Sequence, residues 1–261
     1  MPKSSRQITF RNTQLVLTCE HADNRIPREY AGLFRGAASV VNSHLGWDPG
    51  ALELAQFLGR HFHLPVLYVN WCRLLVESNR APTNPRIWSK YTARLSVADK
   101  HNILERYWWP HRREVEIHIK HRLEQKNKVV HVAVHSFVPV LGGTHRNADI
   151  GLLYDYRRTR ERDFCRRWQS ALANLAPDVR VRRNYPYPGY TDGLCAWLRR
   201  RHRTDRYIGV ELEINQALGK GTGKKSIHQL IANSLEQCMQ NLQSPVNMSA
   251  SHTPSLLSRE Y

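Results

Sequence analysis

The amino-acid sequence predicts an α/β protein with a mostly parallel sheet covered by helices on both faces. Apolar runs rich in β-branched residues alternate with amphipathic segments through most of its 261 residues. This alternation is typical of parallel strands that are connected by helices. Histidines and carboxylates also follow several of these apolar runs directly. Because ligands bind beyond the carboxyl ends of parallel strands, these residues point to a site at one edge of the sheet.

Three elements are predicted near the N-terminus. The apolar runs QLVLTC and PVLYVN each predict a strand. Between them, Pro49 and Gly50 suit the start of a helix. This helix carries four apolar residues on one side, which are Ala51, Leu54, Ala55 and Leu58. The expected elements are a strand over 14–19, a helix over 49–62 and a strand over 65–70.

A long helical segment is predicted over residues 96–125. Ser96 and Asp99 have the spacing of a capping box at its start, and Pro110 is expected to split or kink the helix. The run KVVHVAVHSF over 128–137 then has the strongest strand pattern in the chain. Its β-branched residues include Val129, Val130, Val132 and Val134.

The rest of the chain continues the alternation. The predicted elements are strand 149–154, helix 160–175, strand 179–184, helix 192–201, strand 207–214 and a last helix over about 226–242. We expect a single domain over residues 1–243. Residues 244–261 lose the apolar periodicity and are predicted to form a flexible tail.

The charge balance favours anionic partners or substrates. The chain has 39 lysines and arginines against 22 acidic residues, which gives a net charge of +17. Much of the excess lies in arginine-rich segments over residues 157–206. These segments lack the aromatic pattern of an RNA-binding sheet and the pattern of a helix-turn-helix. We therefore favour solvated basic faces over nucleic-acid binding.

The cysteines and the apolar runs indicate the compartment. The five cysteines are widely spaced and form no CxxC pair, which argues against a disulfide framework and a zinc knuckle. They are predicted to be buried thiols. No apolar run approaches the roughly 18 residues of a membrane helix, and MPKSSRQITFRN lacks the apolar centre of a secretory signal. We therefore expect a cytoplasmic protein.

Two histidines follow apolar strands and have carboxylates nearby. His21 comes after the first predicted strand, and His135 lies late in the strand over 128–137. A catalytic zinc ion accepts two imidazoles and one carboxylate and leaves a fourth position for water. His21 and His135 are therefore the predicted ligands of one zinc ion. Three carboxylates qualify by type as the third ligand: Asp48, Glu20 and Asp23.

Two glutamates in the last predicted strand offer acid–base chemistry. Glu211 and Glu213 are two positions apart, so their side chains lie on the same face of the strand. A carboxylate beside a metal site could act as general base and then donate a proton to the leaving amine. Glu211 is expected to pair with an arginine instead.

Arginines beside these strand ends are candidates for substrate binding. A guanidinium can hold a carboxylate through two parallel hydrogen bonds, which lysine cannot do. Arg73 and Arg80 flank the apolar run LLV, so they fit the end of one strand and the loop after it. Arg146 follows a double glycine that could let it close over the same pocket.

Five ordered motifs resemble the N-formylglutamate amidohydrolase family. They are CEHADNRIP, LGWDPGALELAQFL, CRLLVESNR, HSFVP and VELEINQAL, spread over about residues 14–220. That family is similar in fold to zinc carboxypeptidases and aspartoacylases. The resemblance implies a three-layer α/β/α sandwich with a mostly parallel mixed sheet and one catalytic zinc. It also implies hydrolysis of the amide bond of a small anionic N-formyl or N-acyl amino acid such as N-formylglutamate.

The resemblance also divides the roles. His21 and His135 look like metal ligands with Asp48 as the third, and Glu213 looks like the general base. Asn79 and Arg80 match an NR pair that grips the substrate carboxylate in the wider group, with Arg73 as a neighbour and Arg146 as a further candidate.

The chain departs from the family pattern at two positions, where Glu77 replaces an aspartate and Cys72 replaces a serine. We expect the longer acid to keep a supporting role behind the ligands. Two alternatives stay open. One is a metallopeptidase or deacylase of the same fold, and the other is a non-catalytic relative that binds polyanions.

Overall fold

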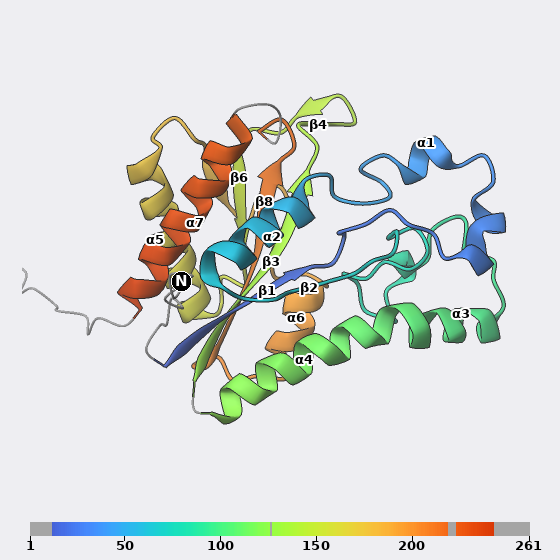
Figure 1. The fold of residues 1–261 in the computed structure, drawn as a ribbon, viewed down its shortest axis with the longest axis horizontal. Coiled ribbons are helices and arrows are strands. Elements are labelled where there is room, and N and C mark those ends of the chain that lie inside the picture. The colour runs from blue at the N-terminus through green and yellow to red at the C-terminus, as the bar shows by residue number, and fades with distance from the viewer. Residues whose placement is uncertain (1–11, 126, 219–222, 243–261) are drawn as a thin grey trace, which may run out of the picture.

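Within the residues that the computed structural model describes, which are 12–125, 127–218 and 223–242, six strands form a central sheet (Figure 1). They are β1 (Thr13–Cys19), β2 (Val66–Tyr68), β3 (Lys128–Phe137), β6 (Ile150–Leu153), β7 (Val181–Arg183) and β8 (Tyr207–Asn215). Their order across the sheet is β2-β1-β3-β8-β6-β7. Neighbouring strands are parallel except β6 and β8, which are antiparallel. The predicted mostly parallel mixed sheet is confirmed.

The two longest strands, β3 and β8, lie side by side at the centre of the sheet. In β3 every residue after Lys128 is buried, and in β8 every residue except Glu211 is buried. Strands covered on both faces are apolar almost throughout, which explains the continuous valine run of β3. The parallel register places His135 beside Glu213, so polar groups from both strands meet near one end of the sheet.

Helices cover both faces of the sheet and complete three layers. On one face lie α2 (Ala51–Phe62), α5 (Thr159–Leu175) and α7 (Gly223–Asn241), and on the other lie α4 (Trp109–Glu124) and α6 (Leu194–Arg199) (Figure 1). The four apolar residues predicted on one side of α2 are all buried against the sheet. None of the helices among the described residues is long and apolar enough to cross a lipid bilayer.

The segment predicted to be a long helix split or kinked at Pro110 contains three parts. They are α3 (Val97–Ile103), a π-helical turn η3 (Leu104–Trp108) and α4. Pro110 lies in the first turn of α4. A proline is tolerated there because its missing backbone N–H would have no helical partner, but it disturbs the hydrogen bonds of the turn before it, which here is π-helical. The oxygen of Ser96 caps α3 by accepting a hydrogen bond from the backbone N–H of Asp99, as the capping-box spacing predicted.

Several short elements lie in segments for which we predicted no regular structure. They are the 3₁₀ helices η1 (Arg28–Phe34) and η2 (Pro85–Ile87), the short helix α1 (Ala38–Val41), and a hairpin of β4 (Val140–Leu141) and β5 (Thr144–His145). The hairpin turns at Gly142 and Gly143, which both have positive φ angles. All five cysteines are free and buried, as predicted. The predicted tail over 244–261 lies outside the described residues.

A buried ion pair joins α5, α6 and β8. Nε of Arg199 donates to Oε1 of Glu161 at 3.0 Å, and its other nitrogens donate to the carbonyl oxygens of Gly189 at 2.6 Å and Gly209 at 2.8 Å. Glu161 is fully buried. Nε of Arg158 lies 3.5 Å from the same oxygen, but Arg199 makes the hydrogen bond to it, so removal of Arg199 leaves the buried carboxylate poorly compensated.

The Arg199→Ala substitution is therefore expected to lower the free energy of unfolding by about 3–5 kcal/mol, as measured by urea denaturation. The matched control is Arg203→Ala, because Arg203 pairs with Asp205 on the surface with 82% of its side chain exposed. Exposed pairs contribute roughly 0–1 kcal/mol. Equal effects of the two substitutions would contradict this reading of the buried pair.

Candidate active site

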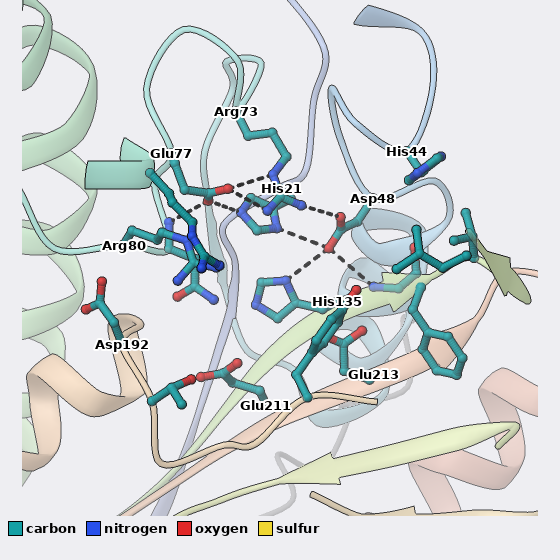
Figure 2. A pocket seen from close by; sticks show the side chains of 18 of the residues that line it. His21, His44, Asp48, Arg73, Glu77, Arg80, His135, Asp192, Glu211 and Glu213 are labelled. Carbon is teal, nitrogen blue, oxygen red and sulfur yellow. Dashed lines mark hydrogen bonds and ion pairs between the residues drawn. The ribbon is translucent and has the colours of Figure 1, made fainter. Parts of the chain in front are cut away.

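One cavity of about 420 Å³ opens beyond the carboxyl ends of β1, β3 and β8 (Figure 2). The eight residues to which the resemblance gave roles all line it, namely His21, Asp48, Arg73, Asn79, Arg80, His135, Arg146 and Glu213. They come from segments far apart in the chain, and the parallel strands bring them to the same edge of the sheet.

Three of these residues form a group that could hold a metal ion. One ligand atom from each of His21, Asp48 and His135 lies within 4.8 Å of the others, and all three residues are buried. Oδ2 of Asp48 lies 3.2 Å from Nδ1 of His21 and 3.0 Å from Nδ1 of His135. The two Nδ1 atoms and one carboxylate oxygen therefore face a common point.

The remaining nitrogen of each histidine contacts a second carboxylate. Nε2 of His21 is hydrogen-bonded to Glu77, and Nε2 of His135 lies 3.0 Å from Glu20. Histidine ligands of metal ions usually donate their second ring N–H to such a group. Two imidazoles, one carboxylate and these supporting acids are a donor set that fits zinc.

Charge holds this group together. Burial opposes ionisation, but hydrogen bonds and negative charge from Asp48 and Glu20 outweigh it and hold the pKa of His135 well above its usual value. The pKa of Asp48 is lowered below its usual range because the charge of His21 and the hydrogen bonds of both histidines outweigh its burial. Since metal binding requires neutral imidazole, a metal ion would compete with protons here.

Asp48 is positioned by the turn that starts α2. Its backbone N–H donates to the carbonyl oxygen of His21 at 2.9 Å, which fixes the loop against the end of β1. Gly50 follows with a φ of 84°, a left-handed conformation that glycine adopts without strain. The segment WDPG thus combines a ligand-type carboxylate with the turn that directs it inward.

The two other candidates for the third ligand lie elsewhere. Glu20 is on the far side of His135, where it contacts Nε2 rather than the shared point. Asp23 accepts hydrogen bonds from the backbone and side chain of Arg25, at 2.9 Å and 2.7 Å. Asp48 is the carboxylate that completes the group of three.

Glu213 lies in the same cavity and is buried. Its Oε2 atom has no hydrogen-bond partner among the described residues. Burial raises the pKa of Glu213 to about 8; the negative charges of Asp48 and Glu211 act in the same direction, while His135 opposes them. A carboxylate with a raised pKa can both accept and return a proton near neutral pH.

Glu211 also lines the cavity, and burial raises its pKa. We expected an arginine to pair with it. Within the described part of the chain Glu211 forms no ion pair with an arginine, although the charges of His135 and Arg199 oppose the rise in its pKa.

Arg73 is tied to the acidic groups of the site. Its Nε donates to Glu77 at 2.8 Å, and its Nη1 donates to Asp48 at 3.3 Å (Figure 2). Arg73 and Glu77 are four residues apart, so the turn over 73–77 brings them together. In this arrangement the guanidinium supports two carboxylates of the site.

Arg80 lies in the cavity with its backbone firmly held. Its carbonyl oxygen accepts hydrogen bonds from Nε1 of Trp108 at 3.0 Å and from Arg112 at 3.1 Å. Asn79 is fixed as well, because its Oδ1 accepts the backbone N–H of Leu194 at 2.7 Å. The NR pair is thus anchored to α4 and α6.

Arg146 reaches the cavity from the segment after the β4–β5 hairpin. It donates to the hydroxyl oxygen of Tyr187 at 2.8 Å, and its guanidinium lies 5.6 Å from the ring centre of Phe137. Its Nη1 atom is buried without a hydrogen-bond partner among the described residues. A carboxylate could satisfy that nitrogen.

Sequence reasoning missed several residues of the cavity wall, which include His44, Arg86, Tyr187, Thr191 and Asp192. Most of them lie in loops between predicted elements. The run YPYPGYTDG over 185–193 carries a turn signal, but nothing in it indicates that the loop folds back toward the cavity.

The fold and the site together define the class of protein. It is a three-layer α/β/α protein with a candidate metal centre at the strand ends and arginines in the same cavity. The model of the family described as N-formylglutamate amidohydrolase matches residues 13–219. The chain belongs to this family.

Two solved structures resemble the protein. A gene product of Agrobacterium tumefaciens is 30% identical, with a TM-score of 0.76, and the match covers 88% of this chain and 92% of that chain. The N-formylglutamate amidohydrolase of Ralstonia eutropha is 18% identical, with a TM-score of 0.63 and the same coverage of 88% and 92%. At that identity the second likeness supports the fold alone. A comparison with curated protein sequences gave no match.

Proposed function

We propose that the protein is a zinc-dependent hydrolase that cleaves the amide bond of an N-formyl or N-acyl amino acid such as N-formylglutamate. One observation carries the proposal. The group of His21, Asp48 and His135 faces the same cavity as Glu213, whose buried Oε2 lacks a partner among the described residues. A ligand set beside an available base is the arrangement that metal-assisted amide hydrolysis requires.

The residues of the chain divide the work between them. His21, Asp48 and His135 would hold the zinc ion, which supplies a Lewis acid that polarises an amide carbonyl. Oε2 of Glu213 would accept a proton from the attacking water and return it to the departing nitrogen. These four side chains are buried, which strengthens the electrostatic interactions between them.

Positive charge would select the substrate. Arg80 is the proposed partner of the substrate carboxylate, because its backbone is anchored and its side chain lines the cavity. Asn79 would support it, and Arg146 would offer a second cationic contact through its unsatisfied Nη1. Arg73 would act indirectly, by holding Asp48 and Glu77 in position.

Metal analysis combined with a substrate panel tests the proposal. We expect about one zinc per chain, hydrolysis of N-formyl amino acids with an acidic side chain, and loss of activity on chelation with recovery on addition of zinc. The panel should pair N-formyl with N-acetyl amino acids and with short peptides. Preferred cleavage of a peptide would indicate a metallopeptidase, and a protein without zinc or hydrolytic activity would refute the proposal.

The Arg80→Lys substitution is expected to raise KM about 10- to 100-fold with little change in kcat. A lysine keeps the charge but loses the two-point hydrogen bond to a carboxylate, and hydrogen bonds to charged groups contribute about 1.5–3 kcal/mol. Steady-state kinetics measures both constants. Arg113→Lys is the control, because Arg113 lies exposed on α4 and pairs with Glu105. An unchanged KM in the Arg80 variant would exclude this arginine as the carboxylate partner.

A further inference from the structure

Each candidate histidine ligand is held at its second ring nitrogen by a glutamate. Nε2 of His135 lies 3.0 Å from Oε2 of Glu20, while Nε2 of His21 contacts Glu77. An ionised carboxylate can only accept hydrogen bonds, so an imidazole that gives Nδ1 to a metal ion keeps its one proton on Nε2, where the glutamate accepts it. The lone pair of Nδ1 is then directed toward the point that both histidines share with Asp48.

The two glutamates have different surroundings. Glu77 also accepts hydrogen bonds from the side chain of Arg73 and from the backbone N–H of Asn79. Glu20 is fully buried, and its two oxygens are divided between two imidazoles. Oε2 faces His135, and Oε1 lies 3.3 Å from Nε2 of His111.

We propose that Glu20 is the positioning residue of His135 and that His111 fixes Glu20 in turn. Glu20 keeps the proton of His135 on Nε2 and so leaves Nδ1 available to the metal ion. This inference rests on the proposed zinc function of the site. It gives α4 a part in the metal centre, although this helix supplies none of the three candidate ligands.

The geometry of α4 supports this role for His111. The residue lies in the first turn of α4, directly after the π-helical turn and Pro110, and is only 7% exposed. Its neighbour Arg112 is also buried and donates to the carbonyl oxygens of Ser78 and Arg80, both at 3.1 Å. The start of α4 is therefore fixed against both the NR loop and the buried face of Glu20.

Zinc affinity tests the proposal without any measurement of catalysis. Titration against a competing chelator should show that Glu20→Gln weakens zinc binding about 10- to 100-fold, the usual effect of losing a group that supports a metal ligand. His111→Gln should weaken it by a smaller factor, because Glu20 keeps its bond to His135. Glu236→Gln is the matched control, since Glu236 also lies 3.0 Å from Nε2 of a histidine, His61, but away from the cavity. Its zinc affinity should equal that of the wild type.

A second measurement tests the proposal on the wild type, without the Glu20→Gln variant. In the zinc-loaded wild type, NMR of the imidazole nitrogens should show His135 bound through Nδ1 with a proton on Nε2. Binding through Nε2 would overturn the proposal, as would unchanged zinc affinity in a folded Glu20→Gln protein. Should that variant not fold, the NMR result and His111→Gln decide. A wild type that binds no zinc would instead reject the proposed function, so the two failures are distinguishable.

Discussion

The His135→Ala variant is expected to lose its zinc and at least about 10³-fold in kcat/KM. A bound metal ion supplies several kcal/mol of transition-state stabilisation, and about 1.36 kcal/mol corresponds to a tenfold change in rate. His135 contributes one of only two imidazoles in the group of three. Its loss also leaves Asp48 and Glu20 without their hydrogen bonds to it, so two buried carboxylates lose a partner at once.

Metal analysis and steady-state kinetics on the same preparation check this result. His21→Ala should behave alike, because Nδ1 of His21 faces the same oxygen of Asp48. His121→Ala is the control, since His121 is exposed on α4 and its hydrogen bond to Gln125 lies on the surface. Full zinc content in both His135→Ala and His21→Ala would contradict the ligand assignment.

Where strands supply the candidate residues, the sequence predicts that these residues lie close together. Alternating apolar runs define β1, β3 and β8, and in a parallel sheet their polar ends must meet at one edge. His21, His135 and Glu213 could therefore be placed together before any coordinates were known. Asp48 could be chosen over Glu20 and Asp23 only through the family resemblance, because residue type alone does not distinguish three nearby carboxylates.

Contacts made across the fold could not be predicted in the same way. The bond between Glu20 and His111 joins residues 91 positions apart and depends on how α4 packs against the sheet. The sequence suggested that the guanidinium of Arg73 binds substrate, but in the structure it is paired with Glu77 and Asp48. The loop that carries Tyr187 has no periodic pattern, so its approach to Arg146 is visible only in three dimensions.

The Glu213→Gln variant is expected to keep its zinc and to lose about 10²–10⁴-fold in kcat, the usual contribution of a positioned general base. Glutamine has nearly the same shape but cannot accept and return a proton. Since Glu213 is not among the three candidate ligands, zinc content and KM should change little. Glu211→Gln is the matched comparison, because Glu211 lies two positions earlier on the same strand and also lines the cavity. Its effect on kcat should be much smaller. A loss below tenfold in Glu213→Gln, or zinc lost together with activity, would show that Glu213 supports the metal centre rather than carrying the proton.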